Sequence, residues 1–254
     1  MTTTHSLLPQ FLSKTVQRAQ RHLAENDYLL SFVQQNNLHF ALKKAQHPQS
    51  EDARLLETDI VFIREKDPAL AHKEEAEVFL YKSLTLTFLH RIAHRIYETG
   101  DTTAARLLSE ANREMTSAEI HPGVQIGHHI FIDHPSGLIV GESTSIGNYF
   151  HGHGQVLLGS DGVNSSAKRH PTIGDYVTIW PKASVLGAKT VGNNVIIGAA
   201  ALVTEDVPDN STVVGHNLLV KKNGISQRVN LRRSEQNGFV FPQPELLFAG
   251  NKSF

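Results

Sequence analysis

The fold is decided by residues 172–203, which read TIGDYVTIWPKASVLGAKTVGNNVIIGAAALV. Aliphatic residues recur there at every sixth position, namely Ile173, Ile179, Val185, Val191, Ile197 and Val203. A six-residue step matches neither the 3.6-residue period of an α-helix nor the two-residue period of an ordinary strand. It is typical of a hexapeptide solenoid, in which short strands wind a triangular prism around inward-pointing aliphatic side chains. The alternative is an ordinary β-sandwich with regular strands, which so long a six-residue register disfavours.

The same step extends upstream, with one slip and one interruption. Its earlier members are Ile120, Ile126, Ile132 and Leu138, then, after a slip of two residues near Val140, Ile146, Gly152 and Leu158. Residues 160–172 break the pattern, so we expect a loop expelled from the prism. A long loop in a regular solenoid is usually functional.

The first 115 or so residues have a helical period instead. Apolar residues at mixed three- and four-residue steps predict amphipathic helices over about 11–35, 52–66, 74–99 and 101–115. Asp67-Pro68 is expected to end the second helix, because a residue before proline avoids the α region. Gly100 suits the position after the third helix, and Asp101 suits the N-cap of the fourth.

Composition excludes several classes of chemistry. The 254 residues contain no cysteine, so a disulfide framework, a thiolate zinc site, an iron–sulfur cluster and a cysteine nucleophile are all excluded. Lys and Arg total 24 against 25 Asp and Glu, which gives no basic footprint for nucleic acid. We expect no membrane span and no secretory signal, and therefore a cytoplasmic protein. The 15 histidines are the unusual feature.

Several segments between about residues 60 and 215 resemble the serine O-acetyltransferases of cysteine biosynthesis. They read DPA at 67–69, RIAH at 91–94, IHPG at 120–123, IDHPSG at 132–137, VGES at 140–143 and RHP at 169–171. The resemblance implies an α + β fold, with an N-terminal α-helical oligomerisation domain (1–116), a left-handed parallel β-helix acyltransferase domain (117–220) and a C-terminal tail (221–254). It implies transfer of an acetyl group from acetyl-CoA to the hydroxyl of L-serine, which yields O-acetyl-L-serine.

Such a transfer needs a base for the hydroxyl proton, donors for the tetrahedral oxyanion and a slot for CoA. An acetyl-cysteine intermediate is impossible without cysteine, so direct transfer is the economical mechanism, and histidine suits the base. The resemblance implies that His134 is this base, that Glu119 orients it in place of the family's aspartate, and that His170 assists at the hydroxyl or the oxyanion. It also implies an acceptor site made of Asp133 for the amino group, Arg169 for the carboxylate, and Glu142.

The CoA slot and the acceptor pocket are less tightly specified. In such folds CoA lies in the groove between adjacent prisms of a trimer, and the candidates by position are Gly159, Ala183, Gly198, Ala199, Ala200 and Lys221. The family has a further acceptor-binding Asp shortly after DPA, where this chain reads AHKEE at 71–75. An unusual HGH at 151–153 also lies near the expected pocket. L-Serine is therefore the preferred acceptor, with homoserine or a sugar hydroxyl as the alternative.

Histidine spacing raises a rival function from another class. His128-His129, His151-x-His153 and the His129-x4-His134 pair suggest a metal site, and the five-residue step of the last pair resembles that of zinc-binding histidines in trimeric γ-carbonic anhydrases. The helical N-terminal half and the RHP segment argue against that class, so we expect no metal. A third alternative is an inactive scaffold. We expect the chain to form a homotrimer, and two trimers could pair into a hexamer. We expect it to bind neither nucleic acid nor a membrane. A sulfhydrylase complex is not favoured, because the tail ends in Phe254 and not in Ile.

Overall fold

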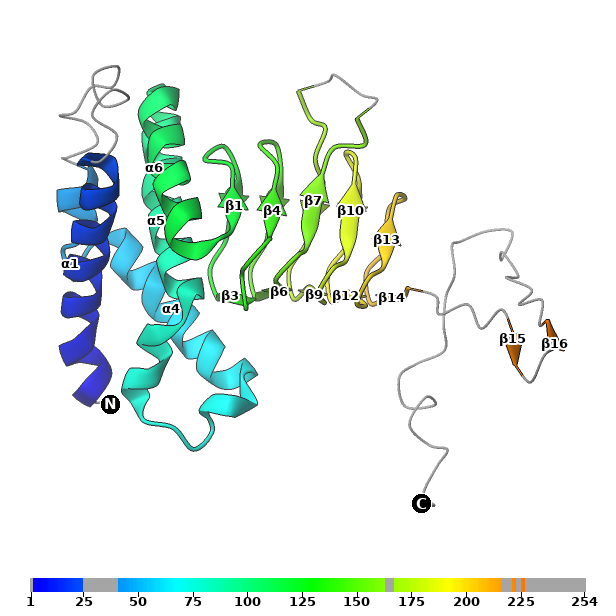
Figure 1. Cartoon of the computed structure of the whole chain (residues 1–254), viewed down its shortest axis with the longest axis horizontal. Coiled ribbons are helices and arrows are strands. Elements are labelled where there is room, and N and C mark those ends of the chain that lie inside the picture. The colour runs from blue at the N-terminus through cyan, green and yellow to red at the C-terminus, as the bar shows by residue number, and fades with distance from the viewer. Residues whose placement is uncertain (1, 25–40, 163–166, 216–220, 223–224, 227–254) are drawn as a thin grey trace.

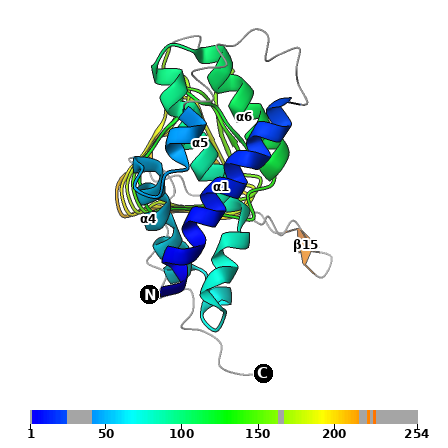
Figure 2. The same cartoon turned by 90° about the vertical axis from the view of Figure 1, so that its left-hand side faces the viewer.

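The computed structural model describes residues 2–24, 41–162, 167–215, 221–222 and 225–226 (Figure 1). Helices gather at one end of a long prism made of short strands (Figures 1 and 2). The helical elements are α1 (Thr2–Ala24), residues 41–45, α4 (Glu51–Lys66), the 3-10 turns η1 (Pro68–Leu70) and η2 (Glu75–Leu80), α5 (Lys82–Glu98) and α6 (Thr102–Thr116). Within these ranges, no helix combines the length and the apolar character that a membrane crossing requires.

Three parallel sheets form the faces of the prism. Sheet A contains β1 (Glu119–Ile120), β4 (Ile139–Val140), β7 (Leu157–Gly159), β10 (Ser184–Leu186) and β13 (Leu202–Val203). Sheet B contains β2 (Gln125–Ile126), β5 (Ser145–Ile146), β8 (Thr172–Ile173) and β11 (Thr190–Val191). Sheet C contains β3 (Ile130–Asp133), β6 (Phe150–His153), β9 (Thr178–Ile179), β12 (Ile196–Ile197) and β14 (Thr212–Val213). Beyond the prism, β15 (Lys221–Lys222) pairs antiparallel with β16 (Ile225–Ser226).

The six-residue step places one aliphatic residue per strand inside the prism. The residues that defined the step in 172–203 are all buried, and they align between coils, as Ile146, Ile173 and Val191 do in sheet B. The described residues 160–162 and 167–171 separate β7 from β8, at the position where the step is interrupted. The predicted left-handed parallel β-helix behind an N-terminal helical unit is therefore confirmed.

Helix side chains cap the first coil of the prism. β3 is the edge strand of sheet C, and an uncovered edge would leave its backbone N–H groups without partners. Asp59 of α4 accepts a hydrogen bond from the N–H of Ile130 at 2.8 Å, and the hydroxyl of Ser83 accepts one from Ile132 at 2.9 Å. The Asp59 carboxylate is itself paired with Arg91 of α5. This network fixes β3, the strand that ends at Asp133, against the helical unit.

Each predicted helix overlaps an observed one, but not every predicted boundary is correct. The second and fourth helices end and begin as expected, with Asp67 as a C-cap and with the Asp101 carboxylate accepting from Ala104 N–H at 3.1 Å. The single helix predicted over 74–99 is wrong at its start, because Tyr81 is extended and separates η2 from α5. The Tyr81 hydroxyl donates to Asp67, and its ring packs on Phe131, so tertiary contacts override the helical pattern. The helix predicted over 11–35 starts earlier, in α1, and residues 25–35 lie outside the described residues.

Candidate functional site

The predicted site residues lie on two different edges of the prism. We call the corners that lead from sheet C to sheet A the His134 edge; they comprise residues 134–138, 154–156, 180–183 and 198–201. We call the corners that lead from sheet A to sheet B the His170 edge; they comprise residues 121–124, 141–144, 160–162, 167–171 and 187–189. His134 belongs to the first edge, with Asp133 beside it at the end of β3, whereas Arg169 and His170 belong to the second. One chain therefore does not bring the two predicted halves of the acceptor site together.

His134 projects from the first corner of its edge into solvent. Its side chain is 94% exposed, and its Nε2 atom lies 3.7 Å from Oδ1 of Asp133. Its backbone φ is +47°, in the left-handed region. Gln155, Lys182 and Ala200 have the same backbone region at the later corners of this edge, so the φ of His134 belongs to the repeat and is not a strain peculiar to the site.

Glu119, predicted to orient His134, forms ion pairs with α6 in this structure. Its carboxylate oxygens lie 3.5 Å from Arg106 and 3.3 Å from Arg113, both on α6. No motif around Glu119 indicates these contacts, because both arginines come from a helix that precedes β1. The Glu119 backbone nevertheless borders the His134 edge, since its N–H donates to Leu138 at 2.8 Å.

His170 is buried and held in one orientation. Its Nδ1 atom accepts from the backbone N–H of Ser143 at 3.2 Å and lies 3.0 Å from the Ser143 hydroxyl. Gly141 makes room for the ring, because a Cβ at that position would overlap it. Burial lowers the pKa of His170, and the neighbouring Arg169 lowers it further. The imidazole is therefore neutral near pH 7, and since Nδ1 accepts, its proton is on Nε2.

Glu142 contacts Arg169 in this chain, where the sequence placed it among the acceptor-binding residues. Its Oε2 atom lies 3.4 Å from the Arg169 guanidinium, and its Oε1 atom accepts from the Tyr97 hydroxyl at 3.0 Å. That hydrogen bond, together with burial, raises the pKa of Tyr97. Ser143 also accepts from the backbone N–H of Arg169 at 3.1 Å. Sequence reasoning missed Tyr97 and the hydroxyl of Ser143, although VGES had marked the segment that contains Ser143.

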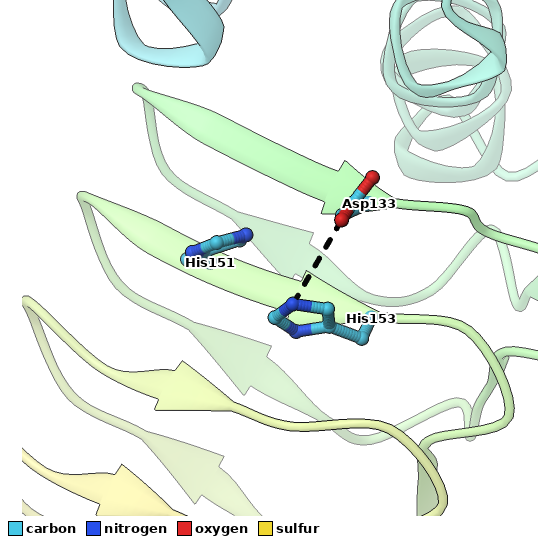
Figure 3. A group of neighbouring side chains, drawn as sticks. All are labelled: Asp133, His151 and His153. Atoms are coloured by element: carbon cyan, nitrogen blue, oxygen red, sulfur yellow. Dashed lines mark ion pairs between the residues drawn. The ribbon is translucent and has the colours of Figure 1, made fainter. Parts of the chain in front are cut away.

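The HGH segment lies beside Asp133 on the outer face of sheet C (Figure 3). Asp133 and His153 are directly opposite each other on β3 and β6, and their Oδ2 and Nε2 atoms are 4.0 Å apart. The His151 ring stacks on Phe131, with centroids 4.7 Å apart, and is tilted against His153 at 4.5 Å. His153 stacks on Trp180 at 4.8 Å. Burial and the neighbouring His153 lower the pKa of His151 to about 4.

The predicted CoA-binding residues divide between packing positions and one exposed corner. Gly198, Ala199 and Ala200 lie at a corner of the His134 edge, three coils from His134. Ala183 is fully buried, and its N–H and C=O are both used inside the prism, so a packing role is favoured for it. Gly159 ends β7 beside the His170 edge. Lys221 lies in β15, and its side chain is outside the described part of the chain.

Two other predicted features are separated by the fold. His129 and His134 lie at opposite ends of β3, so the γ-carbonic-anhydrase spacing does not form a ligand pair within one chain. The AHKEE segment joins η1 to η2, where Glu74 is exposed and Lys73 lies 3.6 Å from Glu77. The structure therefore shows no carboxylate of this segment in contact with Asp133, as far as its described side chains go.

Known proteins resemble this chain in both sequence and fold. No family model matches the sequence. A serine acetyltransferase of Bacillus subtilis is 42% identical over 183 residues, which cover 72% of this chain and 83% of that protein. One of Staphylococcus aureus is 41% identical over 168 residues, or 66% of this chain and 78% of that one.

Solved structures give the same result. Serine acetyltransferase isoform 3 of Entamoeba histolytica, in complex with cysteine, has a TM-score of 0.69 at 28% identity and covers 85% of this chain and 84% of its own. The Brucella abortus serine acetyltransferase in complex with coenzyme A has a TM-score of 0.68 at 28% identity, with 80% and 78% covered. The Neisseria gonorrhoeae serine acetyltransferase in complex with serine has a TM-score of 0.63 at 28% identity, with 81% and 95% covered.

Proposed function

This chain belongs to the serine acetyltransferase family, and on that premise we propose how its residues divide the work of the reaction. The enzyme transfers the acetyl group of acetyl-CoA to the hydroxyl of L-serine and yields O-acetyl-L-serine, a step in cysteine biosynthesis. The observation that carries the division of roles is the pairing of Asp133 with His134 on one edge and of Arg169 with His170 on another.

His134 is the general base in this proposal. Its exposed imidazole removes the proton of the serine hydroxyl while that oxygen attacks the thioester carbonyl carbon. The tetrahedral intermediate then collapses, the carbon–sulfur bond breaks, and the proton returns from His134 to the CoA thiolate. Asp133, one residue away, binds the ammonium group of serine. Glu119 orients the His134 ring, which requires its carboxylate to turn away from Arg106 and Arg113.

His170 acts as a donor and not as a second base. Because its Nδ1 atom is occupied by the Ser143 N–H, the group that it offers is a neutral Nε2–H. A fixed neutral donor suits the developing oxyanion, since it need not reorganise during the reaction. Arg169 binds the serine carboxylate, and Glu142 and Tyr97 hold the guanidinium in position.

In this proposal the active site forms between two protomers, one of which contributes its His134 edge and the other its His170 edge. A homotrimer satisfies this requirement, because each prism then places its His134 edge beside the His170 edge of a neighbour. Apolar side chains exposed on the outer faces, among them Ile139 and Leu202 of sheet A and Ile196 of sheet C, support burial against other protomers. Helix pairing between two trimers extends this proposal to a hexamer.

Acetyl-CoA lies along the His134 edge in this arrangement, with Gly198, Ala199 and Ala200 on its path and Gly159 and Lys221 as further candidates. We propose residues 1–116 as the oligomerisation domain, 117–220 as the acyltransferase domain and 221–254 as a tail. The tail residue Phe254 lies outside the described residues. A cytoplasmic location likewise stays a proposal.

A coupled assay with acetyl-CoA and L-serine tests the assignment of roles. We expect serine-dependent CoA release that falls by about 10²–10⁴-fold in His134→Gln, the range typical of a lost general base. His47→Gln, which changes an exposed histidine in the turn before α4, is the matched control and should keep the parent rate. Glu119→Asp is expected to retain activity and Glu119→Gln to lose it.

Three results would contradict this account. Equal rates in His134→Gln and the parent would show that His134 is not the base. Acetylation of homoserine or a sugar, without acetylation of serine, would show that the acceptor assignment is wrong. A complete absence of acceptor-dependent CoA release would favour an inactive scaffold.

A further inference from the structure

The outer face of sheet C brings together three side chains whose chemistry the acetyl transfer does not require in combination. Asp133, His151 and His153 each offer one ligand atom, and these atoms all lie within 4.8 Å of one another (Figure 3). The two histidines are two residues apart on β6, so both face outward, and Asp133 is opposite His153 on β3. A set of two imidazoles and one carboxylate is a recognised ligand set for divalent first-row transition ions.

Two further observations concern the ring nitrogens that an ion would use. The Nδ1–H of His153 donates to the carbonyl of Ile179 at 2.9 Å, which leaves Nε2 as the nitrogen with a free lone pair. Metal-binding histidines characteristically donate their other N–H to a carbonyl in this way. The Nε2 atom of His151 is buried and has no hydrogen-bond partner within the described part of the chain. A buried nitrogen without a partner is costly, and a bound cation would satisfy it.

The distances are within reach of coordination. An ion equidistant from three atoms that are 4.8 Å apart lies about 2.8 Å from each of them, against about 2.0–2.2 Å for zinc–imidazole and zinc–carboxylate bonds. Inward movement of less than about 1 Å per side chain closes the difference. His153 is stacked on Trp180 and His151 on Phe131, so the two rings are already held near their places.

We propose that Asp133, His151 and His153 form a binding site for a divalent transition cation, with Zn²⁺ as the best match. Two imidazoles favour Zn²⁺, Co²⁺ and Ni²⁺ over Mg²⁺ and Ca²⁺, which prefer all-oxygen sites. Three protein ligands leave coordination positions open for water. The bound ion is coordinated by the carboxylate of Asp133 and places positive charge beside it. If Asp133 binds the ammonium group of serine, as in the proposed function, the cation and the acceptor compete for it.

Metal binding by the full-length protein is the first test, and it is independent of catalysis. We expect titration calorimetry with Zn²⁺, and visible d–d absorption with Co²⁺, to report one ion per chain, and Mg²⁺ to give no heat. His151→Gln and His153→Gln should each weaken Zn²⁺ binding by about tenfold or more. His47→Gln and His128→Gln are the matched controls and should bind as the parent does. Far-ultraviolet circular dichroism verifies that each variant is folded.

The proposal is overturned by a folded parent that binds no Zn²⁺, or by binding that survives His153→Gln and is lost in His128→Gln. The second result would place the ion at the adjacent histidines His128 and His129. Because the first test does not use activity, its failure leaves the proposed acetyl transfer intact.

Kinetics then test the competition, with O-acetylserine measured by chromatography so that zinc binding to the CoA thiol does not interfere. We expect Zn²⁺ to raise the apparent KM for serine while kcat stays constant, and a chelator to reverse the effect. His153→Gln should remove most of this inhibition. Zinc that binds at one ion per chain yet leaves the KM for serine unchanged would support the metal site and contradict the role of Asp133 in acceptor binding.

Discussion

Replacing Asp59 with Asn should destabilise the joint between the helical unit and the prism. The Asp59 carboxylate is fully buried and accepts four hydrogen bonds, from Nη1 of Arg91 at 2.6 Å, Nη2 of Arg91 at 3.1 Å, the Thr87 hydroxyl at 3.0 Å and the Ile130 N–H at 2.8 Å. Asn keeps the shape but leaves the buried guanidinium without a counter-charge. Removal of one partner from a buried ion pair costs about 3–5 kcal/mol, so we expect a loss of this size in the free energy of unfolding.

Urea unfolding followed by circular dichroism, at one fixed protein concentration, measures this loss. Glu77→Gln is the control, because the Lys73–Glu77 pair is exposed and its removal should cost under about 1 kcal/mol. The double variant Asp59→Asn with Arg91→Met removes both charges and keeps an amide oxygen that can accept from the Ile130 N–H, so we expect it to lose less stability than Asp59→Asn alone. A loss below about 1 kcal/mol in Asp59→Asn would refute the reasoning. So would a double variant that loses the sum of the two single losses.

Three further outcomes follow from the same structure. Burial lowers the pKa of His90 to about 3, below its ordinary 6.5, so on acidification the unfolded chain gains a proton on this ring before the folded chain does. The free energy of unfolding should therefore fall by about 1 kcal/mol per pH unit from pH 6 to pH 4, and His90→Gln should flatten that slope in urea unfolding curves. Gly141→Ala should displace the His170 ring and lower kcat about tenfold or more, with a stability loss of about 1–3 kcal/mol; an unchanged kcat would contradict the donor role. Arg169→Lys should raise the KM for serine about tenfold, measured by initial rates, because an ammonium cannot form a bidentate contact with a carboxylate.

The prism could be predicted because the same kind of inward-pointing residue recurs in the sequence at the spacing of the coils. Ile173, Ile179 and Val185 each fill the same interior position, so the local step in the sequence repeats the geometry of the fold. The break at Tyr81 could not, because its cause is a hydroxyl–carboxylate contact with Asp67, 14 residues earlier in the chain. An apolar pattern at helical spacing does not encode such a contact.

Motifs in the sequence nominate candidate site residues but do not say how the fold arranges them. Motif similarity identified His134 and His170, whereas their placement on separate edges depends on which side of a three-sided coil each corner occupies. The contacts of Glu119 with Arg106 and Arg113 arise where α6 meets the first coil, so they have no signature near Glu119 itself. The contact of Asp133 with the HGH segment depends on the pairing of β3 with β6, which places residues 20 positions apart opposite each other. The sequence motifs do not indicate this register.

The stacked coils also act as a ruler along the His134 edge. Neighbouring parallel strands are roughly 4.8 Å apart, so the corner of Ala200, three coils from that of His134, lies roughly 14 Å along the prism. A solenoid can change this length only by adding or removing whole coils. The helical unit packs on the first coil and so fixes the end from which the length is measured. For the proposed cofactor path, the distance between the reacting carbon and the far contacts of an extended thioester is therefore set in discrete steps. Deleting the coil that contains Lys182 would shorten that measure by one step without altering any residue of the first coil.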